Sequence, residues 1–123
     1  MILADGFANV DGIRAPLPSN DVQHAYYKFY AFVVPERLKP DWSRDRIMAA
    51  INAQGIPCTV GSCSEIYREK AFVDRGWGPA GALPIAQELG GTSLMFMVHP
   101  TLSMSTLHRT VDVVRAVMSA AAR

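Results

Sequence analysis

The sequence has 123 residues, of which half are hydrophobic, and it carries 12 basic and 11 acidic side chains. This length and composition predict a single domain with one apolar core, which needs no metal or disulfide to fold. The net charge of +1, without a basic run between aromatic residues, argues against a nucleic-acid partner. Because no apolar stretch is long enough to cross a bilayer and no signal peptide is recognisable, we expect a soluble, cytoplasmic chain without a membrane partner.

The two cysteines, Cys58 and Cys63, are predicted to be free thiols, one of them buried. There is no second cysteine pair, and the three histidines are scattered along the chain. The sequence therefore contains no recognisable set of zinc ligands.

The chain opens with apolar residues at helical spacing, which predict a helix within Met1–Gly12 that Gly12 closes. Because this helix has no N-cap, we expect the intact protein to continue upstream. We therefore also expect Ile2, Leu3 and Phe7 to form an exposed apolar patch that has lost its partner. Residues 13–18 contain two prolines and predict an extended connector.

The central element is predicted to be a strand within Gln23–Pro35, a segment with three tyrosines, two phenylalanines and two valines. Such a composition is typical of strands, and Pro35 marks its end. Both faces of the segment are largely apolar, so we expect a central strand that is covered on both sides.

The rest of the chain predicts alternating helices and short strands. Ser43 is placed to cap a helix over Arg44–Gln54, with Gly55 directly after its end. The further elements are a strand at Cys58–Val60, a short helix at Glu65–Phe72 capped by Ser64, a helix at Leu83–Leu89 ended by Gly90 and Gly91, a strand at Ser93–Val98 and a last helix capped by Ser103 or Ser105. This order predicts an α/β sandwich of two layers, with a small mixed or antiparallel sheet of about three strands packed against helices.

Four groups of residues, in this order and spacing, carry a family resemblance. They are His24-Ala25-Tyr26 opening a strand, Gly55-Ile56 after a helix, Pro84 to Glu88 before a glycine, and His99 to Ser103 before the last helix. Together they resemble the C-terminal domain of the DegT/DnrJ/StrS family, which are fold type I aminotransferases that use pyridoxal phosphate (PLP) and act on nucleotide-linked keto-sugars. The resemblance covers nearly the whole chain.

The resemblance implies that residues 1–123 form one domain, the C-terminal small domain of a longer enzyme of sugar or polysaccharide biosynthesis. In this family the small domain covers the active-site mouth, and the partners are its own large N-terminal domain, a second copy in a homodimer and the nucleotide-sugar. The PLP lysine and phosphate site belong to the large domain, and none of Lys28, Lys39 and Lys70 matches that lysine. We therefore expect the isolated chain to bind no PLP and to have no transaminase activity.

The resemblance also places a substrate-facing segment after Gly55-Ile56. The family carries a histidine-tyrosine pair, a proline and a second histidine there, whereas a gapless alignment puts Gly61-Ser62, Cys63 and Tyr67 at these positions. Because all of these positions differ from the family pattern, the substrate of the intact enzyme is open to differing from those of typical family members. Ser62 and Tyr67 are the main candidate substrate-binding residues.

Two further candidates also have structural alternatives, which for His24 carry about equal weight. Arg68 is placed to meet a phosphate, although an exposed helical arginine is usually only solvated. His24 would contact a ligand at the edge of the sheet, or else fix the start of the strand. From composition alone, residues 61–64 are also more typical of an ordinary capped turn than of a binding loop.

A second function class is compatible with the pattern of helices and strands. A free-standing ligand-binding or regulatory module of ferredoxin-like type also places a small sheet against helices. The helical start without an N-cap and the order of the family motifs argue against this alternative.

Overall fold

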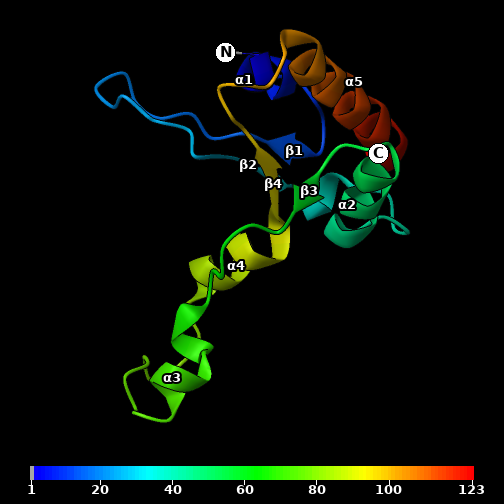
Figure 1. Cartoon of the computed structure of the whole chain (residues 1–123). Helices are drawn as coiled ribbons and strands as arrows, with labels where there is room; N and C mark the ends of the chain where they lie inside the picture. Colours follow the sequence, from blue (N-terminus) through cyan, green and yellow to red (C-terminus); the bar gives the residue numbers. More distant parts are fainter. Residues whose placement is uncertain (1) are drawn as a thin grey trace.

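The computed structural model describes residues 2–123. Its helices and strands are α1 (Ile2–Phe7), β1 (Ile13–Arg14), β2 (Lys28–Val33), α2 (Arg44–Ala53), β3 (Cys58–Thr59), α3 (Lys70–Val73), α4 (Pro84–Thr92), β4 (Ser93–Met97) and α5 (Met104–Ala121). The sheet and the helices α1, α2 and α5 form a body (Figure 1). Two segments project from this body: an arm, residues 60–92, which carries α3 and α4, and a loop, residues 15–27.

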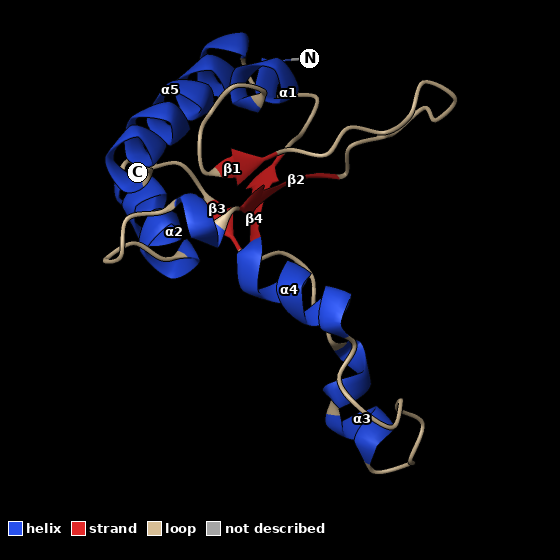
Figure 2. Cartoon of the chain, turned by 180° about the vertical axis from the view of Figure 1, so that it is seen from behind, coloured by secondary structure: helices blue, strands red, loops and turns tan. Residues whose placement is uncertain are grey.

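The four strands form one antiparallel sheet in the order β1-β2-β4-β3. Helices α2 and α5 lie on the same side of the strands in both views (Figures 1 and 2). The predicted two-layer α/β fold is thus confirmed, with four strands in place of about three. The additional strand is β1, which we expected to be part of a connector. Ile13 and Arg14 both precede Pro16, so their backbone N–H groups are available to pair with Val33 and Phe32.

Strand β2 is shorter than the predicted Gln23–Pro35 and is covered on one face only. It begins at Lys28 because Tyr26 has a left-handed backbone, with φ of 49°, and donates its N–H to Nδ1 of His24 at 2.9 Å. The expectation that His24-Ala25-Tyr26 opens the strand is therefore wrong. Along β2, buried residues alternate with the half-buried Lys28, Tyr30 and Phe32, which define an open face of the sheet.

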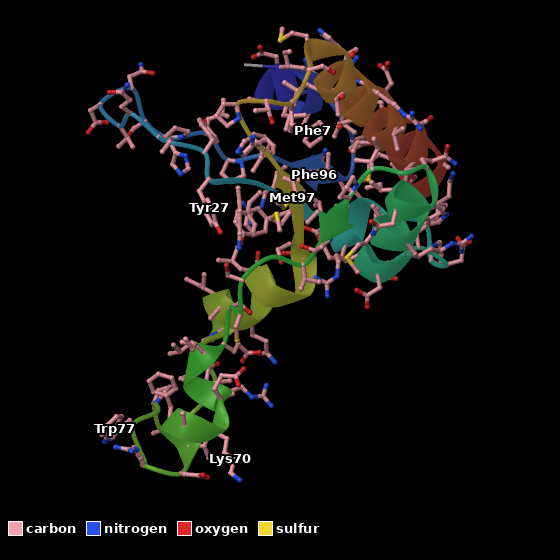
Figure 3. All side chains as sticks on the ribbon, viewed as in Figure 1. Phe7, Tyr27, Lys70, Trp77, Phe96 and Met97 are labelled. Carbon is pink, nitrogen blue, oxygen red and sulfur yellow. The ribbon has the colours of Figure 1, made fainter. Side chains whose placement is uncertain are left out.

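The apolar side chains of α1 are largely buried, which corrects the expected exposed patch. Leu3 is 3% and Phe7 1% exposed, and Ile2 is half-buried. The ring of Phe7 lies edge-on to those of Phe29 and Phe96, with centroids 5.7 and 5.3 Å away (Figure 3). Because the apolar residues of α1 fall on one side, the helix packs on α5 and on the covered face of the sheet.

The predicted caps of the two long helices are confirmed. The Ser43 hydroxyl accepts the N–H of Arg46 at 3.2 Å at the start of α2, and Gly55 follows this helix with φ of +76°. Ser103, rather than Ser105, accepts the N–H of Thr106 at 3.1 Å at the start of α5.

The ends of the elements in the arm differ from the predicted ones. Helix α4 continues through Gly90 and Gly91 to Thr92, because the Arg44 guanidinium donates to the carbonyls of Gly90 at 3.2 Å and Ser93 at 3.1 Å. Ser64 caps no helix, and its side chain lies against Gly90. The expected short helix is divided into a turn of 3₁₀-helix, Ile66–Arg68, and α3.

The two thiols should differ sharply in reactivity. Cys58 is buried and Cys63 exposed, and both are free, as predicted. Burial raises the pKa of Cys58 to about 12. At about pH 8 we expect a disulfide reagent to label one thiol per folded chain rapidly, and mass mapping to identify the exposed Cys63.

The same shift makes stability depend on pH in the alkaline range. The unfolded chain loses the Cys58 proton at a lower pH than the folded chain does. The stabilisation that comes from burying the neutral thiol is therefore fully present at neutral pH and declines as the pH rises towards 12.

In the labelling experiment, equal rates for Cys58 and Cys63 in the folded chain would contradict the assigned burial of Cys58.

Candidate functional site

A groove of about 330 Å³ lies on the open face of the sheet, beside the 15–27 loop. Its lining includes His24, Lys28, Tyr30 and Phe32, together with prolines of the loop. The lining residues include two basic side chains and no carboxylate. The groove is therefore a basic and aromatic surface.

Ser62 and Tyr30 join the beginning of the arm to this groove. The Ser62 N–H donates to the Tyr30 hydroxyl oxygen at 3.0 Å, and the Tyr30 hydroxyl lies 3.3 Å from Oγ of Ser62. Nζ of Lys28 donates to the same Oγ at 3.3 Å. Gly61 permits this approach, because its φ is +85° and any Cβ there would overlap the Tyr30 ring. Ser62 is exposed, as predicted, and lies at the edge of the groove.

Electrostatics around Tyr30 favour negative charge. Burial acts to raise the pKa of Tyr30, but hydrogen bonds from the Ser62 side chain and N–H and the charge of Lys28 outweigh it, so that the pKa lies below its ordinary value. The hydrogen-bond donors and the cation that stabilise the ionised form of Tyr30 also favour the binding of another anion at the same place.

His24 lies on the groove in a defined orientation. Its Nδ1 accepts the N–H of Tyr26, and the two rings lie 4.4 Å apart between centroids. An accepting Nδ1 places the proton of the neutral ring on Nε2, so that this atom is a donor. His24 therefore fixes the turn before β2 and also lines the groove.

Tyr67 and Arg68 lie in a different place, a pocket of about 550 Å³ within the arm. Tyr67 is half-buried, and its O–H donates to Oε1 of Glu65 at 2.6 Å while its oxygen accepts the N–H of Leu83 at 3.0 Å. The hydrogen bond to Glu65 raises the pKa of Tyr67. Arg68 forms an exposed ion pair with Glu65 at 3.5 Å. These contacts give Tyr67 a structural role in connecting two parts of the arm.

The four candidate residues thus divide into two pairs. Ser62 and His24 are associated with the groove, through Lys28 and Tyr30, whereas Tyr67 and Arg68 line the pocket of the arm. The sequence pattern places Lys28 and Tyr30 only within the predicted central strand, Gln23–Pro35. The sequence does contain a signal for an open face, namely a lysine in the middle of an apolar strand. A strand covered on both sides rarely contains an unpaired charge.

Tyr67→Phe should loosen the arm while leaving the body intact. The change removes two hydrogen bonds, and each typically contributes about 1 kcal/mol, so we expect the Leu83 amide to exchange its hydrogen on the order of thirtyfold faster. The 3₁₀ turn Ile66–Arg68 and α3 contain no buried residue, so thermal unfolding of the body should hardly change. The highly exposed Tyr27, changed to phenylalanine, provides the control. Unchanged exchange at Leu83 would show that Tyr67 does not hold the arm.

Metal and membrane sites are not evident in the described part of the chain. Among residues 2–123, no group of three or more histidine, cysteine, aspartate or glutamate side chains is placed to hold a metal ion. Within the same range, no helix has the length and apolar character needed to cross a membrane.

Solved structures identify the class of protein to which this fold belongs. No family model and no curated protein sequence matches the chain. An aminotransferase from Psychrobacter cryohalolentis matches 97% of the chain with 42% identity and a TM-score of 0.89, and the match covers 32% of that protein. A DegT/DnrJ/EryC1/StrS aminotransferase from Brucella abortus matches 93% of the chain with 19% identity and a TM-score of 0.74, over 28% of its length. DesV from S. venezuelae, in complex with a ketimine intermediate, matches 94% with 22% identity and a TM-score of 0.77, over 29% of its length.

These matches confirm the resemblance to aminotransferases of the DegT/DnrJ/StrS family, whose fold the chain shares over nearly its whole length. The two matches below 25% identity show the fold alone. The chain spans about a third of the length of the aminotransferases that it matches.

Proposed function

We propose that residues 1–123 are the C-terminal small domain of a PLP-dependent aminotransferase that aminates a nucleotide-linked keto-sugar in sugar or polysaccharide biosynthesis. The observation that carries this proposal is the 42% identity to the Psychrobacter aminotransferase over 97% of the chain and 32% of that enzyme. In the intact enzyme this domain covers the active-site mouth, and a large N-terminal domain and a second copy are its partners.

The keto group of the proposed substrate agrees with the ligand named for DesV, a neighbour that shares the fold at 22% identity. The DesV structure contains a ketimine, which is an imine between an amine and a ketone carbon. This is the linkage expected when a keto group is exchanged for an amino group. The sugar and the nucleotide come from the family resemblance.

The arm supports a large protein partner. Its exposed apolar side chains include Val73, Trp77 and Ile85, which are 58%, 66% and 72% exposed, and the tip with Trp77 lies far from the body (Figure 3). An apolar surface of this kind marks an interaction site. The arm, rather than α1, thus presents the surface suited to the remainder of the enzyme.

The lysines of this chain do not fit the role of the PLP lysine. PLP supplies an aldehyde that a lysine amine holds in a covalent linkage. Nζ of Lys28 is bonded to Ser62 and Nζ of Lys39 to the Ala120 carbonyl at 2.7 Å, while Lys70 is exposed at the tip of the arm (Figure 3). None of the three matches the PLP lysine of the family, and the proposal therefore assigns the cofactor to the large domain.

The chain alone should therefore form no lasting PLP adduct. After mixing with PLP and dialysis, we expect its visible spectrum to return to that of the untreated protein and its transaminase activity to be absent. Adducts at exposed lysines should be removed by the dialysis. A Schiff-base absorbance band that survives dialysis and is lost in one lysine variant would contradict the assignment of the cofactor to another domain.

A free-standing ligand-binding module remains the second candidate, and the burial of Leu3 and Phe7 favours it. The buried face of α1 needs no partner to cover its apolar side chains. The length of the natural reading frame separates the two functions. A frame that encodes a large α/β domain with a PLP lysine before this chain supports the aminotransferase, and a frame of this chain alone supports the module.

A further inference from the structure

We propose that Arg44 of α2 sets the direction in which the arm leaves the body. Arg44 acts as a clamp on the covered side of the sheet, opposite a latch that Tyr30 and Ser62 form on the open face. This role concerns the geometry of the arm and is independent of the proposed function.

The arm is joined to the body only at its base. It leaves the sheet after β3 and returns at the start of β4, and in neither view does an element of the body lie beside α3 (Figures 1 and 2). In the part of the arm farthest from the sheet, the 3₁₀ turn Ile66–Arg68 and α3 contain no buried residue. Contacts at the base, within residues 60–64 and 90–93, therefore fix the direction of the arm.

Arg44 connects the last turn of α4 to the first residue of β4. Its Nη1 donates to the carbonyl oxygens of Gly90 at 3.2 Å and Ser93 at 3.1 Å, while its Nε donates to Oδ1 of Asp45 at 2.6 Å. The Arg44 side chain is only 17% exposed, so water competes little for these hydrogen bonds. Carbonyl groups in the last turn of a helix lack partners within the helix and carry partial negative charge, which favours a guanidinium there. One cation thus holds the helix of the arm against a strand of the body.

The two segments at the base of the arm are also bonded to each other. Oγ of Ser93 donates to the Val60 carbonyl oxygen at 2.8 Å. The Ser64 side chain lies so close to Gly90 that a Cβ at Gly90 would overlap it. Because the outgoing and returning segments are connected in this way, a support that holds one of them also holds the other.

The latch supports the arm from the opposite side of the sheet. The Ser62 N–H donates to the Tyr30 hydroxyl oxygen at 3.0 Å on the open face, whereas α2 packs on the covered face through Ile47 and Ile51. Supports on opposite faces resist tilting of the arm in both directions. An arm that is already fixed loses less conformational freedom when a partner binds.

The test measures the distance between spin labels on the arm and the body by pulsed electron paramagnetic resonance. The labels are attached at Lys70→Cys on the tip of the arm and at Ser119→Cys on the exposed surface of α5. Cys63→Ser removes the exposed thiol, and the remaining thiol, Cys58, is buried. We expect one narrow distance distribution, and in Arg44→Met a distribution at least about twofold broader, as for a locally released segment. Arg44→Lys keeps the charge but not the planar fork, so its distribution should be intermediate.

Arg46→Met is the matched control. Arg46 lies on the same helix, but its guanidinium donates to Asp41 at 2.7 Å and lies over the Trp42 ring, outside the arm, so the distribution should stay narrow. An unchanged distribution in an Arg44→Met variant that is folded by circular dichroism, or a broad one in the labelled protein that retains Arg44, would refute the clamp. If Arg44→Met does not fold, Arg44→Lys decides: a broadened distribution supports the clamp, and one as narrow as that of the protein with Arg44 refutes it.

Discussion

Phe7→Ala should lower the free energy of unfolding by about 3–5 kcal/mol, the usual cost of removing a large buried aromatic side chain. Phe7 is 1% exposed and its ring contacts those of Phe29 and Phe96, so truncation leaves a cavity between α1 and the sheet. Urea unfolding followed by circular dichroism gives the free energy directly.

Phe72→Ala is the matched control for this substitution. Phe72 lies on α3 in the arm, where it is only partly covered and outside the core. We expect a change below about 1 kcal/mol, as for a residue outside a packed core. Equal losses in the two variants would mean that α1 does not complete the core, and that the N-terminal segment is instead available to a partner.

Gly61→Ala should separate the arm from Tyr30 and cost on the order of 2–4 kcal/mol, the sum of left-handed backbone strain and overpacking. The φ of Gly61 is +85°, and a Cβ at this position would overlap the Tyr30 ring. The contacts of Tyr30 with Ser62 should be lost, and with them the lowered pKa of Tyr30. Urea unfolding and a pH titration of tyrosine absorbance measure the two effects.

Gly76→Ala separates the two causes. Gly76 also has a positive φ, of +66°, but no atom lies within 4 Å of the position that its Cβ would take. This variant should show the backbone strain of about 1–2 kcal/mol without the overlap, as faster amide hydrogen exchange within the arm, while urea unfolding of the body hardly changes. If Gly61→Ala and Gly76→Ala have the same effect, the close approach of Gly61 to Tyr30 is not a constraint on the fold.

Those parts of the fold that depend on local chemistry were predictable from the sequence. The serines at positions 43 and 103 begin α2 and α5 because a hydroxyl accepts a free N–H at each helix start. The apolar run Ser93–Val98 forms β4, which ends one residue earlier, at Met97. The short length of the run and the Gly91 and Pro100 that flank it favour a strand over a buried helix.

The parts that depend on distant contacts were not predictable. Strand β1 has two residues, too few for any periodic pattern, and exists because β2 pairs with it. Helix α4 continues through Gly90 because Arg44, 46 positions away in the sequence, donates to the Gly90 carbonyl. The burial of α1 depends on α5, at the other end of the chain.

The candidate site was predictable only in part, for a related reason. A family alignment led to Ser62, but the importance of Lys28 and Tyr30 appears only when β2 and the beginning of the arm lie side by side. Tyr67 was selected by the same alignment, and its hydrogen bonds to Glu65 and Leu83 give it a structural role as well. A sequence position identifies a candidate, whereas the bonding partners define what its side chain can do.

Amino transfer by the natural polypeptide that contains this chain tests the central proposal most directly. The purified protein would be supplied with PLP, an amino donor such as glutamate and a nucleotide-linked keto-sugar, and the aminated nucleotide-sugar would be measured by mass spectrometry. We expect product with the natural polypeptide and none with residues 1–123 alone. A natural polypeptide that consists of these 123 residues, or a longer one that binds PLP but forms no aminated nucleotide-sugar from any keto-sugar supplied, would contradict the proposal.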